Sequence, residues 1–320
     1  MLLKSLLAKT RHYHPSYQGG LSNHCSMTLI ALERMGASPQ RVESFAHAYL
    51  KRMEPAPIAG DAIDAENWRE RLGDEAAYGV VAEDADEIAV GLAYWASRYL
   101  ALPERTDMPS ELPFAASDDP WQVLKKTRTW PGLEFEPDAD ALIDQEMLKA
   151  ANTTLFPLIA ASLEVDELTL DRLRQSAALM FLGANDFNSL HAVTGLHAAR
   201  ILSDFAIDRR AFAREVWRAL LALYFSLDRP EVPSPASAAE LTAEDLPDWN
   251  AILAAAVADN DEHVIKLVFS CLAESRSGGG RLYRYLAARK VGLLGTADGV
   301  SDNAPVASAG DMAPSDHASA

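Results

Sequence analysis

Histidine and lysine side chains within apolar segments are the residues of this sequence best suited to chemistry. Four of the eight histidines have mainly apolar rather than charged neighbours: His24, His191, His197 and His263. Neutral imidazole is a common ligand for transition metals. A single buried histidine is more often a hydrogen-bonded core residue than a ligand, so a metal site requires several of these histidines to meet.

The segment that begins at Asp261 adds a lysine to this set. His263 and Lys266 are three residues apart, which places them ~60° apart around a helix. The residues after Lys266 are almost all apolar, and desolvation there favours the neutral amine. A neutral amine can react with carbon dioxide to form a carbamate, which is an anionic oxygen ligand. The alternative, favoured by the pattern alone, is that the lysine stem packs while its ammonium reaches water.

His191 and His197 lie six residues apart on one predicted helix. Six residues rotate by ~600°, so the two side chains point about 120° apart and a straight helix cannot aim both at one ion. Gly195 between them would permit a kink or close helix packing. Otherwise one histidine is a ligand and the other orients it. We favour His191 as the ligand and retain His197 as the weaker candidate.

Helical periodicity dominates the rest of the chain, and sustained runs of alternating apolar and polar residues are absent. Ser38 followed by Pro39 is a typical helix start, and Asp208 is a candidate N-cap for another helix. The sequence therefore predicts an all-α, bundle-like fold. Helices are expected at about 21–35, 38–49, 64–72, 84–99, 138–151, 169–182, 187–204, 208–224, 246–258, 261–274 and 281–291.

Two proline-rich segments, 103–137 and 228–248, are predicted to be long loops. In the first, Trp121, Trp130 and Phe135 would either cover a flat substrate or anchor the loop. Residues 295–320 contain no Lys, Arg or aromatic residue, so we predict a disordered tail. We expect one helical domain over 1–294 followed by this tail over 295–320.

Composition and missing motifs exclude several classes of function. Acidic residues outnumber basic ones by 46 to 29, and the net charge of −17 disfavours nucleic acid and anionic membranes as partners. The two cysteines have no metal-site or disulfide spacing, so a cytoplasmic location is expected. No apolar run reaches 18 residues, which argues against a membrane span. Phosphate-loop, nucleophile-elbow, zinc-protease, dinucleotide and di-iron motifs are also missing.

Six motifs together resemble the questin oxidase family, which includes the Baeyer–Villiger-type oxidases of aflatoxin-type pathways. They are spread over residues 14 to about 292, and their combination is more specific than any one of them. The motifs are Asn23-His24, Leu29-Ile30-Ala31-Leu32, Gly36-Ala37-Ser38, Leu72-Gly73-Asp74, the stretch from Leu190 to Ala198, and His263-Val264-Ile265-Lys266.

The resemblance implies an all-helical oxygenase that inserts oxygen into aromatic polyketides, notably anthraquinones, or cleaves their rings. It also implies a mononuclear non-haem iron, Fe(II), held by several histidines and a carbamylated lysine. Lys266 matches that lysine, and by the same match His24, His191 and His263 become ligand candidates, with His197 either a ligand or an orienting neighbour. This agreement reverses the preference for a lysine that merely packs. The implied reactants are a small aromatic substrate, dioxygen and NADPH.

One departure from the family pattern concerns the segment after Leu72. Family members carry further helices and a histidine there, whereas here Gly73-Asp74 leads almost directly into Ala77-Tyr78-Gly79. His14 or His47 would have to substitute, although surface or packing roles are expected for both. A second hypothesis is therefore a non-catalytic relative that binds an aromatic metabolite without metal. A third is a structural role in an assembly, which predicts a large exposed apolar patch. The sequence does not specify the oligomeric state.

Overall fold

The computed structural model describes residues 2–17, 20–56, 69–70, 72, 99–103, 114–130, 135–138, 141–243 and 245–294. The regular structure of these residues is helical except for one short hairpin, in which β1 (Ser16–Tyr17) pairs antiparallel with β2 (Leu21–Ser22). The prediction of an all-α fold is confirmed. No described helix is both long enough and apolar enough to cross a membrane.

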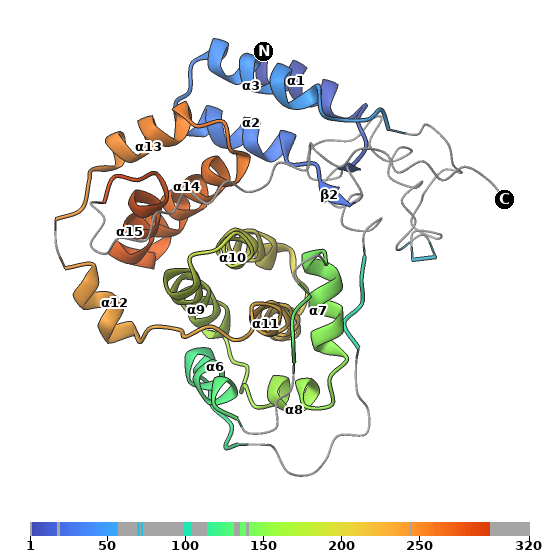
Figure 1. Ribbon diagram of the computed structural model, residues 1–320, viewed down its shortest axis with the longest axis vertical. Coiled ribbons are helices and arrows are strands. Elements are labelled where there is room, and N and C mark those ends of the chain that lie inside the picture. Colours follow the sequence, from blue (N-terminus) through green and yellow to red (C-terminus); the bar gives the residue numbers. More distant parts are fainter. Residues whose placement is uncertain are drawn as a thin grey trace.

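Three helices at the beginning of the chain form a layer at one end of the molecule (Figure 1). The third helix starts as predicted, because the Ser38 side chain accepts a hydrogen bond from the backbone N–H of Arg41 and Pro39 occupies the first turn. The three helices pack against one another through their apolar faces. They are α1 (Leu2–Thr10), α2 (Cys25–Arg34) and α3 (Pro39–Leu50).

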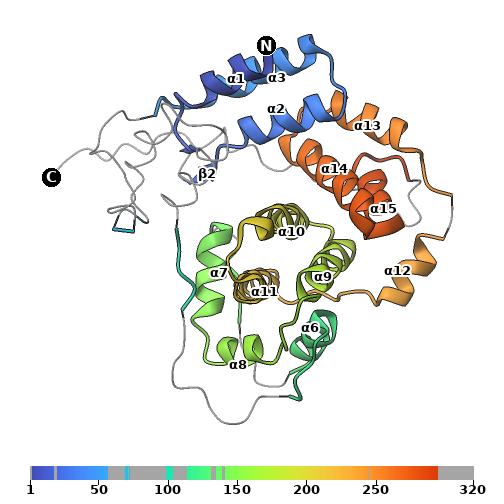
Figure 2. The same cartoon turned by 180° about the vertical axis from the view of Figure 1, so that it is seen from behind.

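A second group of helices surrounds α11, which carries the fully buried side chains of Trp217, Tyr224 and Phe225. Figures 1 and 2 show α11 nearly end-on, with α7, α9 and α10 around it. Asp208 caps α11 as predicted, because its side chain accepts from the backbone N–H groups of Arg210 and Ala211. The group comprises α6 (Pro120–Arg128), α7 (Ile143–Ala151), α8 (Phe156–Ala161), α9 (Thr169–Ala184), α10 (Leu190–Leu202), the 3-10 turn η1 (Ser203–Phe205) and α11 (Arg209–Ser226).

The last helices join these two groups. The amphipathic helix α14 packs against α2 on one side and against α10 on another, with α13 and α15 completing its surroundings. Its residues are continuously buried from Val264 to Val268. The elements are α12 (Pro235–Leu241), α13 (Trp249–Ala258), α14 (Glu262–Glu274), the π-type turn η2 (Ser275–Gly279) and α15 (Gly280–Lys290).

The two proline-rich segments correct one prediction, because each contains a helix instead of being loop throughout. Pro120 and Pro235 open α6 and α12 at a position where the missing N–H is not needed. Asp119 and Ser234 cap these helices with side-chain oxygens. Helices α1 and α8 were also not predicted. The tail over 295–320 and almost all of the helices expected at 64–72 and 84–99 lie outside the described residues.

Candidate metal centre

Three helices that are distant in the sequence bring three of the predicted histidines together. His24 is the N-cap residue of α2, His191 lies in the first turn of α10, and His263 lies in the first turn of α14. The packing of α14 against both α2 and α10, visible in Figure 1, places all three helix starts at one point.

The imidazoles are close enough to share one ion. One ring nitrogen from each of His24, His191 and His263 lies within 4.8 Å of the other two. The ring centroids of His24 and His263 are 5.1 Å apart, those of His191 and His263 5.6 Å, and those of His24 and His191 6.5 Å. This is a three-histidine group of the kind that holds zinc or iron in proteins.

Local hydrogen bonds orient two of the rings. His191 Nδ1 lies 3.0 Å from the carbonyl oxygen of Phe187, and His263 Nδ1 lies 3.0 Å from Oδ1 of Asp261. Both oxygens accept, so each Nδ1 carries the proton and each Nε2 keeps its lone pair free for a metal. Asp261 also caps α14 by accepting from the backbone N–H of His263, so the start of the helix and the orientation of the ring are fixed together.

His24 is held differently. Its backbone N–H donates to the Tyr49 hydroxyl at 2.8 Å, which anchors the start of α2 to α3. Its Nδ1 atom is buried and has no hydrogen-bond partner among the described residues. A buried polar atom without a partner is costly in a folded protein. A bound cation at this point would satisfy it.

Burial favours the uncharged forms of His24, His191 and Lys266. Desolvation, with a smaller contribution from the charge of the nearby Lys266, lowers the pKa of His24 far below its ordinary value and that of His191 to about 4. Burial also lowers the pKa of Lys266 to about 7, although the carboxylates of Glu262 and Asp261 act in the opposite direction. The Lys266 residue is only 6% exposed. Near neutral pH the site therefore offers neutral imidazoles at His24 and His191 and an amine of which roughly half is deprotonated.

A phenylalanine that sequence reasoning missed lies against two of the histidines. The Phe187 ring centroid is 4.6 Å from that of His263 and 5.2 Å from that of His191, both in edge-on geometry. Phe187 is 45% exposed, so part of the residue contacts solvent beside the two imidazoles. Its position four residues before His191 is the signal that could have indicated it, because such residues share a helix face.

A buried acid beside His263 was missed as well. Glu262 is 6% exposed, and both of its oxygens lie 3.4 Å from the Arg52 guanidinium. That guanidinium stacks 4.2 Å from the ring centroid of Tyr49, the residue that anchors His24. Through Arg52, Glu262 therefore links the start of α14 to the turn that follows α3 and to Tyr49, the residue that anchors His24.

His197 is not part of the three-histidine group. Its Nδ1 lies 2.7 Å from Oε1 of Glu274, a carboxylate that is 1% exposed and also accepts from Arg174 and Arg200. The angle of about 120° between His191 and His197 on a helix accounts for this separation. His197 fastens α10 to the end of α14, while His191 faces the start of α14.

The aromatic residues expected to cover a substrate pack elsewhere. Trp121 donates from its indole nitrogen to the carbonyl of Val232, and the Phe135 ring is 6.2 Å from that of Phe225 on α11. Trp130 contacts Phe114 at 5.6 Å. They anchor the proline-rich segment, which is the alternative the sequence left open.

His14 and His47, named as substitutes for a missing histidine, do not join the three-histidine group either. His14 Nδ1 lies 2.8 Å from the backbone oxygen of Ser16, and His47 is exposed on α3. The segment from Asp74 to Gly79, where the sequence departs from the family pattern, lies outside the described residues.

Comparison with known proteins bears on this site. The family model described as Questin oxidase-like matches residues 76–271, more than half of the chain. The matched range contains His191, His263 and Lys266, whereas His24 precedes it. No match was found among curated proteins. The chain belongs to the Questin oxidase-like family.

Proposed function

We propose that this protein is an oxidoreductase of the questin oxidase type that uses Fe(II) and dioxygen to insert oxygen into polycyclic aromatic ketones such as anthraquinones, or to cleave their rings. The observation that carries the proposal is the meeting of His24, His191 and His263, with ring nitrogens within 4.8 Å, in a chain of this family.

The residues present fit a ferrous ion. Imidazole is a suitable ligand for Fe(II), and the lowered pKa values keep His24 and His191 free of competing protons. The unpartnered Nδ1 of His24 and the free Nε2 atoms of the other two rings provide the donors. When bound, Fe(II) would supply the redox chemistry that lets dioxygen react.

Lys266 is proposed to complete the site as a carbamate. In that reaction the neutral Nζ forms a bond to the carbon of carbon dioxide and releases one proton, which leaves an anionic oxygen donor. The low exposure of Lys266 and its pKa of about 7 support the reaction, because the neutral amine is the reactive form. Its position one turn after His263 supports a role at the same point.

The substrate and the reductant are proposed from the chemistry of the reaction. The edge of Phe187, half exposed beside two imidazoles, offers a surface on which a flat aromatic ring can pack. Insertion of one oxygen atom from dioxygen leaves the second atom to be reduced to water, which requires two electrons. NADPH is proposed as their source on the family resemblance alone.

The test is elemental analysis of protein purified without chelator, with oxygen uptake measured in the presence of an anthraquinone and NADPH. We expect one iron per chain in the wild type and in the His47→Ala control, which alters an exposed histidine of α3. We expect His263→Ala to lose both iron and oxygen uptake. Little iron in the wild type, with aromatic ligand binding unaffected by His263→Ala, would contradict the proposal and favour a non-catalytic binding protein.

A further inference from the structure

An arginine outside the three-histidine group contacts the supports of two of its members. Arg52 lies in the turn that follows α3, where its backbone N–H donates to the carbonyl of Tyr49 at 3.0 Å. Its guanidinium lies 3.4 Å from both carboxylate oxygens of Glu262, the residue before His263. The same guanidinium lies 4.2 Å from the ring centroid of Tyr49, whose hydroxyl accepts from the backbone N–H of His24. One cation therefore joins the starts of α2 and α14.

The groups that surround this cation are buried. Tyr17, Tyr49 and Glu262 are all buried, whereas the Arg52 side chain itself is 43% exposed. The Tyr17 ring centroid is 6.0 Å from the guanidinium and 6.4 Å from the Tyr49 ring centroid, in edge-on geometry. A cation that lies against aromatic rings and a desolvated carboxylate is held more firmly than one in a fully exposed ion pair.

The contact with Arg52 also decides the partner of Glu262. Glu262 stands four residues before Lys266 on α14, the spacing at which a glutamate and a lysine commonly pair along a helix. The structure pairs Glu262 with Arg52 instead. Among the residues that the structure describes, the Lys266 amine makes no ion pair or hydrogen bond. Arg52 thus keeps a buried carboxylate away from the proposed fourth ligand.

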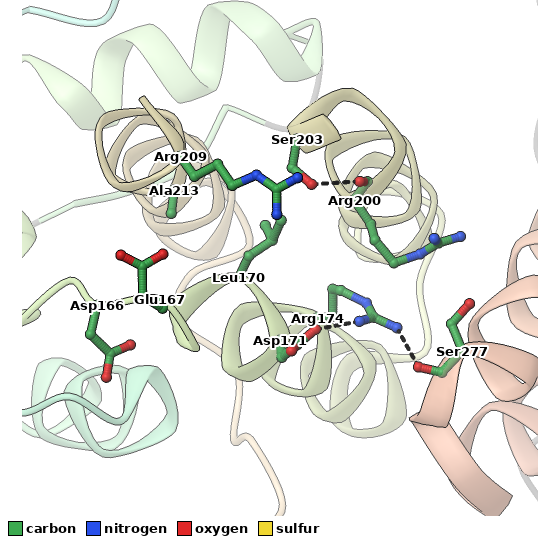
Figure 3. Close-up of a pocket in the computed structure, with 10 residues that line it drawn as sticks. All are labelled: Asp166, Glu167, Leu170, Asp171, Arg174, Arg200, Ser203, Arg209, Ala213 and Ser277. Atoms are coloured by element: carbon green, nitrogen blue, oxygen red, sulfur yellow. Dashed lines mark hydrogen bonds and ion pairs between the residues drawn. The ribbon is translucent and has the colours of Figure 1, made fainter. Parts of the chain in front are cut away.

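The opposite end of α14 has an ion-pair network of its own. There the buried carboxylate of Glu274 accepts from Arg174 and Arg200, which line a cleft of about 200 Å³. Figure 3 shows the Arg174 guanidinium bonded to Asp171 and to Ser277. These contacts fasten α9 and α10 to the end of α14, far along the helix from the histidines. This second network therefore provides a control for the first.

We propose that Arg52 is a positioning residue of the metal centre. It holds His24 through Tyr49. It holds the start of α14, and with it the His263 imidazole, through Glu262. Residues that orient the ligands of a metal commonly set its affinity. Because Arg52 acts on two of the three imidazoles, its loss should change the geometry around a bound ion as well as the affinity. The inference rests on the proposed function, since it requires a metal at the three histidines.

The test uses Co²⁺ alone as the probe, because the visible absorption of this ion depends on the number and geometry of its ligands. Affinity is measured on the full chain by competition with a chelator. We expect Arg52→Met to raise the dissociation constant about 10- to 100-fold and to change the spectrum of the bound ion. Arg52→Lys should recover part of the affinity, because an ammonium can still pair with Glu262 and lie over the Tyr49 ring.

Arg200→Met is the matched control, because it also removes an arginine from a buried glutamate of α14. It should lower stability to urea and leave the affinity for Co²⁺ and the spectrum unchanged. The double variant Arg52→Met/Glu262→Gln covers the case in which Arg52→Met fails to fold, since it leaves no unpaired buried carboxylate. It should bind Co²⁺ about as weakly as Arg52→Met, because the two residues act through one contact.

Two kinds of result separate this inference from the proposed function. Wild-type affinity and spectrum in Arg52→Met would overturn the inference alone. An equal loss of affinity in Arg200→Met, or additive losses in the double variant, would do the same, because the effect would then not pass through Glu262. A wild type that binds no Co²⁺ would overturn the metal centre itself, and the inference with it.

Discussion

Replacing Glu274 by glutamine should destabilise the fold strongly, because this carboxylate is the buried centre of a charged network. It is 1% exposed, and it accepts hydrogen bonds from His197 at 2.7 Å and from Arg200 at 2.8 Å, as well as from Arg174. These partners come from α9 and α10, so the network fastens both helices to the end of α14.

The magnitude follows from the surroundings of the carboxylate. Hydrogen bonds from His197 and Arg200, together with the charge of Arg174, outweigh burial and lower the pKa of Glu274 from 4.5 to about 2. Such a shift corresponds to about 3 kcal/mol of stability, present above pH 4.5 and lost as the pH falls toward 2. Removing the charge also leaves the buried Arg174 guanidinium with only the exposed Asp171 as its carboxylate, and breaking a buried ion pair typically costs about 3–5 kcal/mol.

The assay is urea unfolding followed by circular dichroism, at pH 7 and at several lower values. We expect Glu274→Gln to lose about 3–5 kcal/mol at pH 7, and the difference from the wild type to shrink as the pH falls below 4.5. Glu215→Gln is the control, because Glu215 also pairs with an arginine, at 2.7 Å, but its side chain is 57% exposed; it should change stability by less than about 0.5 kcal/mol. A loss below about 1 kcal/mol for Glu274→Gln, or a difference independent of pH, would refute this account.

Three further predictions concern the metal centre. In carbonate buffer containing carbon-13, a carbamate signal should rise as the pH passes through 7 and vanish in Lys266→Met, because a pKa of about 7 leaves roughly half of the amine neutral there; a signal that survives the substitution would come from another amine. Phe187→Ala should retain iron but bind flat aromatic ligands about 3- to 10-fold more weakly by calorimetry, because an aromatic contact is lost; unchanged affinity would remove Phe187 from the ligand site. Tyr49→Phe should lower iron affinity about 10- to 100-fold in a chelator competition, because the backbone N–H of His24 loses its acceptor; wild-type affinity would show that this anchor is dispensable.

The sequence predicted where several helices begin better than it predicted which helices pack together at the candidate site. Asp208 and Ser38 cap helices as their types and neighbours indicated, and the apolar run after Lys266 is the buried face of α14. The two proline-rich segments were wrongly predicted to be loops throughout. Their prolines indicated loops by number, whereas the position of a proline relative to the start of a helix decides its effect. Pro120 and Pro235 stand in first turns, where proline favours a helix.

The candidate site depends on tertiary contacts that no local pattern contains. His24 and His263 are brought together by the packing of α2 against α14, and single-sequence periodicity does not report which helices pack. The angle between His191 and His197 showed that they face different ways, but it could not show that Glu274 would be the partner of His197. Phe187 and Glu262 were missed because neither stands in a motif.

The position of His24 ahead of α2 has a consequence for how the protein would respond to loss of its metal. An ion shared by His24 and His263 would cross-link the first helices to the last and close almost the whole described chain into a loop. After loss of the ion, the amide hydrogens of the N-terminal layer would exchange sooner, while those of α11 and its surroundings stay protected. Iron would then contribute to the local stability of one end of the molecule as well as to its chemistry.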